Sequence, residues 1–246
     1  MQGLLSSSPT DAVSGGAPAV ADIGISERLD FLRKTYGLFT LGVGTSAVGA
    51  LAGLTVLSNV FMGMHPLVLF IAYIAAYFAV YAVRKVPVVN VVAMLAFTFI
   101  SGLFIAPLLA HTLITKGIAV GLANIMTAFL GTTLGFGGLT AYVMISRKDF
   151  SFLGGFLAIG LFGLIGVVLA SLLLPMVGMS MGSFNPATSI AFNLFGLLLF
   201  SGFVLYDTSN ILHHYAQDEY VMAALALFLD FILIFKYLLR LLNSRD

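Results

Sequence analysis

Long apolar runs divide most of this sequence into segments separated by short polar or proline-containing breaks. An α-helix needs about 20 apolar residues to cross about 30 Å of hydrocarbon. The pattern predicts seven spans of this kind, at residues 37–58, 66–83, 88–110, 118–145, 152–177, 189–212 and 221–242. The connections are short, so successive helices are expected to lie antiparallel. The fold class is therefore an all-α, polytopic membrane bundle of seven transmembrane helices.

The chain before the first span has a different composition. Residues 1–25 are rich in Ser, Gly, Ala and Pro, and they lack the basic stretch and early apolar stretch of a signal peptide. We expect a disordered cytoplasmic tail there, followed by a transmembrane domain at 26–246. Residues 26–36 read as an amphipathic lead-in, with Ser26 as its N-cap, which is expected to lie along the membrane surface.

Basic residues in the short connections indicate the orientation. Lys and Arg precede the first span and follow the second and fourth spans, at Arg28, Arg33, Lys34, Arg84, Lys85, Arg147 and Lys148. The positive-inside rule therefore predicts a cytoplasmic amino terminus. Seven crossings place Arg240 and Arg245 outside, whereas a re-entrant last segment would return them to the cytoplasm. The length of the last apolar run favours a crossing.

Composition narrows the possible functions. Of 246 residues 60% are hydrophobic and 9% charged, so almost no chain is left for a soluble domain. A net charge of +1 without a dense basic cluster argues against a nucleic-acid partner. The absence of cysteine excludes disulfides and thiol chemistry. No histidine lies at membrane depth beside a serine, so we expect neither an enzyme, nor a catalytic residue, nor a cofactor. Membrane lipid is the evident partner, and the sequence predicts no particular oligomeric state.

Two carboxylates, Asp207 and Asp230, interrupt the last two apolar runs. A turn near Asp218 would place them at the same depth of a helical hairpin, and a turn nearer Ala216 would offset them by about 6 Å. A buried acid needs a proton, water, protein or a cation beside it. Two acids in a dry site cannot both ionise cheaply, so the pair is expected to share a proton or to bind a cation, either H⁺ or Ca²⁺.

Other side chains offer support for this pair or an alternative to it. Hydroxyl groups that could cap a protonated acid lie on Tyr206, Thr208 and Ser209. Pro107 removes a helical hydrogen bond in the third span, where a kink could line a cavity. Tyr206 before Asp207 also matches half of an intramembrane aspartyl protease, but Asp230 lacks the glycine-rich context of the second half.

Three stretches of this sequence resemble the Bax inhibitor family. They are YDTSNILH at 206–213 with the apolar run that follows, LRKTY at 32–36 and RKDFSFLGG at 147–155. The third stretch is similar to the bacterial YccA-type branch, whose members modulate the membrane protease FtsH. The resemblance covers nearly the whole chain after residue 26.

The resemblance implies a seven-helix bundle in which the last helix is central, located in a bacterial cytoplasmic (inner) membrane. It implies a first function, which is to bind FtsH and restrain its proteolysis. It also implies an alternative, because calcium-leak members use two carboxylates as a pH-sensitive latch and the matching positions here are Asp207 and Asp230. Both functions are hypotheses at this point.

Overall fold

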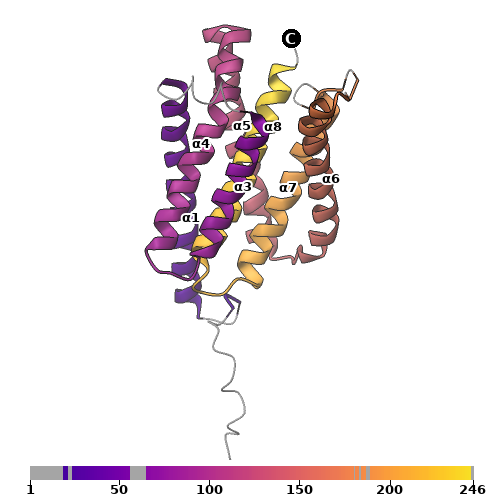
Figure 1. The fold of residues 1–246 in the computed structure, drawn as a ribbon. Helices are drawn as coiled ribbons and strands as arrows, with labels where there is room; N and C mark the ends of the chain where they lie inside the picture. Colours follow the sequence, from indigo (N-terminus) through magenta and orange to yellow (C-terminus); the bar gives the residue numbers. More distant parts are fainter. Residues whose placement is uncertain are drawn as a thin grey trace, which may run out of the picture.

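A computed structural model describes residues 19–21, 24–55, 65–179, 181–182, 184–186 and 189–244. Its helices run side by side along a common direction (Figure 1). The described α-helices are α1 (Ile25–Thr55), α3 (Pro66–Ala82), α4 (Val89–Lys116), α5 (Ile118–Ser146), α6 (Gly154–Leu173), α7 (Ile190–His213) and α8 (Tyr220–Asn243). Short 3-10 turns, η1 (Ser151–Leu153) and η2 (Leu174–Val177), flank α6. The predicted all-α bundle is confirmed.

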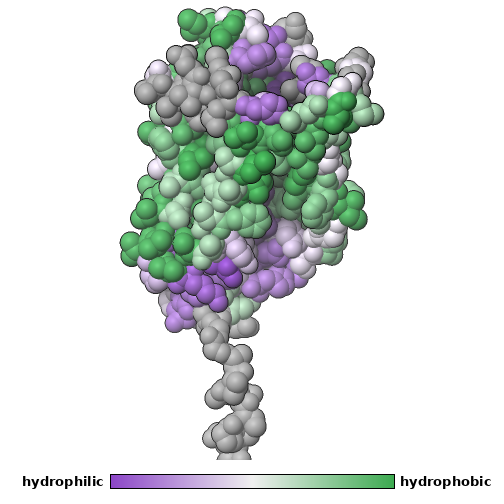
Figure 2. Space-filling view, in the orientation of Figure 1, coloured by the Kyte–Doolittle hydropathy of each residue, from purple (hydrophilic) through white to green (hydrophobic). Residues whose placement is uncertain are grey.

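The surface carries the signature of a membrane protein. Figure 2 shows a hydrophobic band around the middle of the bundle, with hydrophilic residues gathered toward its two ends. Large apolar side chains on the outer helices are exposed, among them Leu134 on α5 and Phe156 and Phe162 on α6. Six described helices are long and apolar enough to cross a membrane, while α3, with 17 residues, is shorter. The chain is thus a multi-pass membrane protein.

The last helix lies at the centre of the bundle, as the resemblance implied. α8 packs against α1, α4, α5 and α7. Within its most apolar stretch 61% of the residues are buried, against 39% or less in the other five long helices. α8 is also one uninterrupted helix of 24 residues, so it has no break of the kind that a re-entrant segment would need.

Glycines allow α1 and α4 to approach until their backbones touch. A Cβ atom at Gly49 would overlap the carbonyl oxygen of Phe99, and a Cβ atom at Gly102 would overlap that of Ser46. Such close packing of small residues holds helices together in lipid, where burial of apolar surface gives no net driving force. The α1–α4 pair is therefore a tightly packed part of the bundle.

The expectation of a separate surface helix at residues 26–36 is wrong. α1 runs without interruption from Ile25 to Thr55. No proline breaks the segment, and its inner side chains Phe31 and Thr35 are buried in the bundle. The lead-in is therefore the first part of helix α1. The end of the predicted first span, residues 56–58, lies outside the described residues.

The outer helix α3 is held loosely. Its described contacts are mainly with α4, and Val80 is its one fully buried residue within the described range. A helix with few buried contacts opens at a lower free-energy cost than a core helix. α3 can thus move with little disruption of the core.

Candidate functional site

A short turn joins α7 to α8 and holds the two helices antiparallel. The backbone N–H groups of His214 and Tyr215 both donate to the carbonyl oxygen of Asn210, at 2.7 and 3.0 Å. The N–H of Ala216 donates to a carboxylate oxygen of Glu219 at 3.1 Å. These bonds satisfy groups at the end of α7 that would otherwise lack partners. They fix the geometry of the hairpin.

The hairpin brings Asp207 and Asp230 together. Asp207 lies six residues before the end of α7, and Asp230 lies ten residues after the start of α8. Their carboxyl groups lie close enough to interact directly. Asp230 is only 3% exposed, and Asp207 is partly buried. The two acids of the sequence prediction therefore form one site.

The chemistry of this contact is restricted. The Oδ2 atom of Asp230 is buried, and no described N–H or O–H group donates to it. Two ionised carboxylates have no hydrogen to share and repel each other strongly in a medium of low dielectric constant. The contact is favourable when one proton lies between the oxygens, or when a cation does.

No basic side chain compensates the pair among the described residues. The ion pair found there joins Lys34 to Asp30 at 2.7 Å on the exposed side of α1. A buried acid pair of purely structural use would be expected to have a basic partner. Charge at this site must therefore be balanced by protons or by a cation from solution.

An open cavity of about 650 Å³ lies beside the pair at the end of the bundle that holds the α7–α8 turn. Tyr77 of α3 and Tyr215 of the turn lie within electrostatic range of Asp207. Burial, with a smaller contribution from the charge of Asp207, raises the pKa of Tyr215, so its hydroxyl stays neutral at physiological pH. The lining includes Tyr77, Arg84, Tyr206, Asn210, His214 and Tyr215. The cavity gives solvent a polar approach to the neighbourhood of Asp207.

The segment before α1 contacts the same turn. The N–H of Val20 donates to the carbonyl oxygen of Tyr215 at 2.9 Å, and Ala19 pairs with Ala216 in an antiparallel bridge. Val20 is completely buried in the core cluster that contains Phe31 and Ile211. Contact with the bundle thus begins before residue 25, the boundary expected for the tail. Residues 1–18 of that expected tail lie outside the described residues.

The hydroxyl groups expected to cap the acids are placed elsewhere. Ser209 Oγ accepts from the N–H of Phe150 at 2.8 Å and donates to Asp149 at 3.3 Å, tying α7 to the loop before η1. A 2.8 Å bond from the N–H of Ser151 also holds the pKa of Asp149 below its ordinary value. Ser209 therefore anchors the loop at the start of α6 and does not cap the acid pair.

Tyr206, Thr208 and Pro107 also lie away from the acids. The ring of Tyr206 covers Gly154 at the start of α6. The hydroxyl of Thr208 lies close to that of Tyr36, but neither group has a partner of good hydrogen-bond geometry among the described residues. Pro107 lies within an uninterrupted α4 and does line a cavity, but that cavity is at the other end of the bundle.

Asp207 and Asp230 together supply only part of the ligands that a calcium ion needs. Ca²⁺ takes six to eight oxygen ligands, and two carboxylates supply at most four. No group of three or more metal-ligating side chains occurs in the described part of the chain. Asp207 and Asp230 can therefore hold a cation that keeps part of its water shell, which suits transient binding better than a resident structural ion.

The sequence analysis did not identify Lys236 and Arg240 of α8 as functional candidates. Lys236 and Arg240 point into cavities at the end of the bundle opposite the α7–α8 turn. The signal was present, because Lys236 lies inside the predicted last span, six residues after Asp230. An ionisable residue within a span is a functional candidate whether it is acidic or basic.

Comparison with known proteins identifies relatives along almost the whole chain. Residues 28–246 match the family described as "Inhibitor of apoptosis-promoting Bax1". "Bax inhibitor 1" of Schizosaccharomyces pombe is 34% identical over 91% of this chain and 80% of its own length. An uncharacterised protein of Campylobacter jejuni is 34% identical over 89% of this chain and 90% of its own length. "Protein lifeguard 4" of Mus musculus is 30% identical over 92% and 89%, respectively.

Proposed function

This chain belongs to the Bax inhibitor family, and we propose that within this family it acts as a pH-dependent cation leak of a bacterial cytoplasmic membrane. The observation that carries the proposal is the contact between the carboxyl groups of Asp207 and Asp230 inside the bundle. Acids in the interior of a membrane bundle commonly mark ion or proton pathways. Cation flux into liposomes containing the purified protein, with and without the two acids, tests the proposal.

In such a leak the described arrangement would be the closed state. One cavity approaches the acids from the α7–α8 turn, and a second cavity lies toward the other end of α8. Aromatic rings of Tyr73, Phe97 and Phe228 pack in sequence between α3, α4 and α8, with centroids 5.2 and 6.5 Å apart. Movement of the loosely held α3 would separate these rings and open a route past them.

Protons and cations compete for the same oxygen atoms of Asp207 and Asp230, because a carboxylate must lose its proton to bind a metal ion. A cation held between two ionised carboxylates leaves slowly, and conduction requires binding weak enough to allow departure. A proton that replaces the cation releases it. We therefore expect flux to rise as the pH falls on the side of the α7–α8 turn.

The buried Val20 supports a role for the amino-terminal segment in closing this end. Val20→Asp is expected to raise cation flux, since burying an uncompensated charge costs several kcal/mol and would detach the segment from the turn. Ala21→Asp is the matched control, because this substitution adds the same charge one residue later, at an exposed position. Flux and protease sensitivity of residues 1–24 should both increase for Val20→Asp alone. Equal values for the two variants would contradict this role.

A second candidate function is the FtsH contact implied by the sequence resemblance, and the outer face of α6 favours it. α6 packs against α7 and the flanking 3-10 turns within the described structure. Gly163 and Gly166 are exposed, and a side chain added at either would meet no other atom. Small residues on an exposed helix face allow a partner helix to approach closely.

Substitution of these two glycines tests the FtsH contact. Gly163→Leu with Gly166→Leu is expected to reduce co-purification of FtsH about tenfold, because bulky side chains on this face would cost a partner helix about 1.4 kcal/mol or more. Gly135→Leu with Gly138→Leu is the control on α5, where both glycines are equally exposed and have equal spacing. FtsH recovered equally with both pairs, or not at all with the unsubstituted protein, would exclude this contact.

A further inference from the structure

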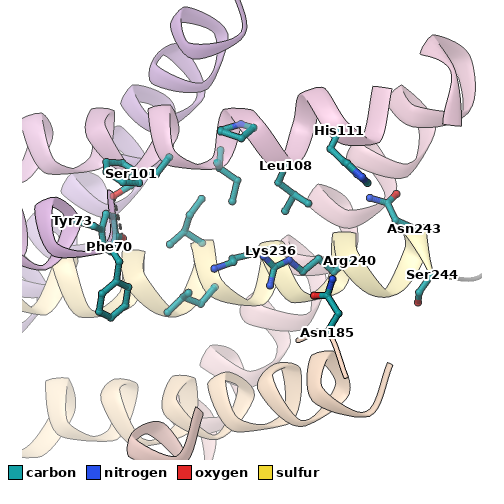
Figure 3. Close-up of a pocket in the computed structure, with 15 residues that line it drawn as sticks. Phe70, Tyr73, Ser101, Leu108, His111, Asn185, Lys236, Arg240, Asn243 and Ser244 are labelled. Atoms are coloured by element: carbon teal, nitrogen blue, oxygen red, sulfur yellow. Dashed lines mark hydrogen bonds between the residues drawn. The ribbon is translucent and has the colours of Figure 1, made fainter. Parts of the chain in front are cut away.

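A cavity of about 600 Å³ opens between α3, α4 and α8 at the end of the bundle opposite the acid pair. Figure 3 shows Lys236 and Arg240 extending from α8 into the space below α4, with His111 and Asn243 at one end and Tyr73 and Ser101 at the other. Figure 2 shows hydrophilic residues gathered at this end of the bundle. The cavity therefore combines a basic centre with a position at the edge of the hydrophobic band.

Two cavities share these cations. A second cavity, of about 480 Å³, lies on the other side of α8 toward α6, and it is also lined by Lys236, Arg240 and Asn185. Lys236 and Arg240 are one helical turn apart and close enough to repel each other. A ligand held between them would be reached from either cavity.

Neither cation is balanced by the described chain. No carboxylate of the described residues forms an ion pair with Lys236 or Arg240. The Nε atom of Arg240 is buried and has no hydrogen-bond partner within the same residues. Lys236 instead lies over the ring of Tyr237, with 6.0 Å between its Nζ atom and the ring centroid. Two adjacent cations without a counter-charge are costly inside a bundle, which favours a negatively charged ligand between them.

The lining indicates which anion fits. Lys and Arg donate hydrogen bonds and accept none, and the planar guanidinium of Arg240 matches two oxygens of a phosphate. The remaining lining is largely apolar and includes Phe70, Phe104 and Leu108. Apolar walls around a paired basic centre suit a phosphate that carries a hydrocarbon portion, although the basic centre alone would also accept free phosphate.

We propose that this cavity binds a phosphate group between Lys236 and Arg240. The site is separate from the acid pair, and it does not depend on whether the protein conducts cations. Bound phosphate would lie between α8 and α4. It would supply the negative charge that the described residues do not provide there. Its two sources, an anionic phospholipid and inorganic phosphate, present the same group to the two cations.

Binding to the full-length protein in dodecyl maltoside tests this proposal. One arm measures the phosphatidylglycerol that is retained against phosphatidylcholine, by native mass spectrometry. The other arm measures the thermal shift caused by inorganic phosphate against chloride at equal ionic strength. Lys236→Gln with Arg240→Gln should weaken binding at least tenfold, because it removes both charge-assisted hydrogen-bond donors of the site. Lys85→Gln with Lys148→Gln, which removes two exposed cations at the other end, is the matched control.

The outcomes separate the two sources. Retention of phosphatidylglycerol alone identifies a lipid headgroup site, and an additional shift by inorganic phosphate identifies an open phosphate site; both support the proposal. The Lys236/Arg240 variant should also be at least as stable as the unsubstituted protein without phosphate, since it removes uncompensated charges. Equal binding by this variant and the control, or no binding by the unsubstituted protein in either arm, overturns the proposal.

Discussion

Replacing Asp207 and Asp230 together by asparagine should abolish the pH dependence of cation flux. Asparagine keeps the shape and the hydrogen-bonding ability of the side chain but can neither ionise nor bind a cation by charge. The ratio of flux at about pH 6 to flux at about pH 8, well above one in the unsubstituted protein, should fall to about one. Liposomes loaded with a calcium-sensitive dye and acidified on one side at a time provide the measurement.

The control for this experiment must remove the same charge without touching the pair. Asp30→Asn with Asp218→Asn does so, because both residues are exposed and lie toward the same end of the bundle. This control should keep the pH profile of the unsubstituted protein. A double asparagine variant with an unchanged profile would exclude the acid pair as the pH-sensitive element, and an unsubstituted protein without flux would exclude the leak itself.

The second large effect is expected on stability, from Gly102→Ala. The added methyl group would overlap the carbonyl oxygen of Ser46, so α1 and α4 would have to move apart along their closest contact. Overpacking of this kind costs about 1–3 kcal/mol and occasionally more, which outweighs the gain of about 0.5–1 kcal/mol for alanine over glycine in a helix. The midpoint of thermal unfolding in detergent should fall clearly.

Gly135→Ala is the matched control for Gly102→Ala. Gly135 also lies inside a helix, but a Cβ atom there would meet no other group. This variant should be neutral or slightly more stable. Gly49→Ala should destabilise as Gly102→Ala does, because it affects the same interface, and the two effects should not add fully. Equal midpoints for Gly102→Ala and Gly135→Ala would show that the α1–α4 contact relaxes without cost.

The fold and the meeting of the two acids could be predicted from the sequence because both depend on local patterns. Apolar runs broken by polar residues set the helices, and a six-residue connection between α7 and α8 set the hairpin. The centre of the turn lies nearer Ala216 than Asp218. Asp207 and Asp230 are therefore offset along the hairpin and do not lie at the same depth. Hairpin geometry and helical rise were sufficient to bring Asp207 to Asp230.

Other features depend on contacts between distant segments, and the sequence carries no local signal for them. The hydroxyl of Ser209 looked suited to the neighbouring acid, but the loop at Asp149 and Phe150 occupies it. Residues 26–36 would have a polar side both as a separate surface helix and as the start of α1. Only their packing against the rest of the bundle shows that Phe31 is a core residue. Burial of Val20 against Ile211 likewise follows from tertiary structure alone.

The central position of α8 has a consequence for biosynthesis. The ribosome makes α1, α4, α5 and α7 before the helix against which all four pack. Until α8 enters the membrane, these helices face lipid or one another with surfaces shaped for an absent neighbour, and Asp207 has no Asp230 beside it. A premature stop codon at or before position 220 would therefore remove the centre of the protein, and membrane quality control should recognise such a product as unassembled.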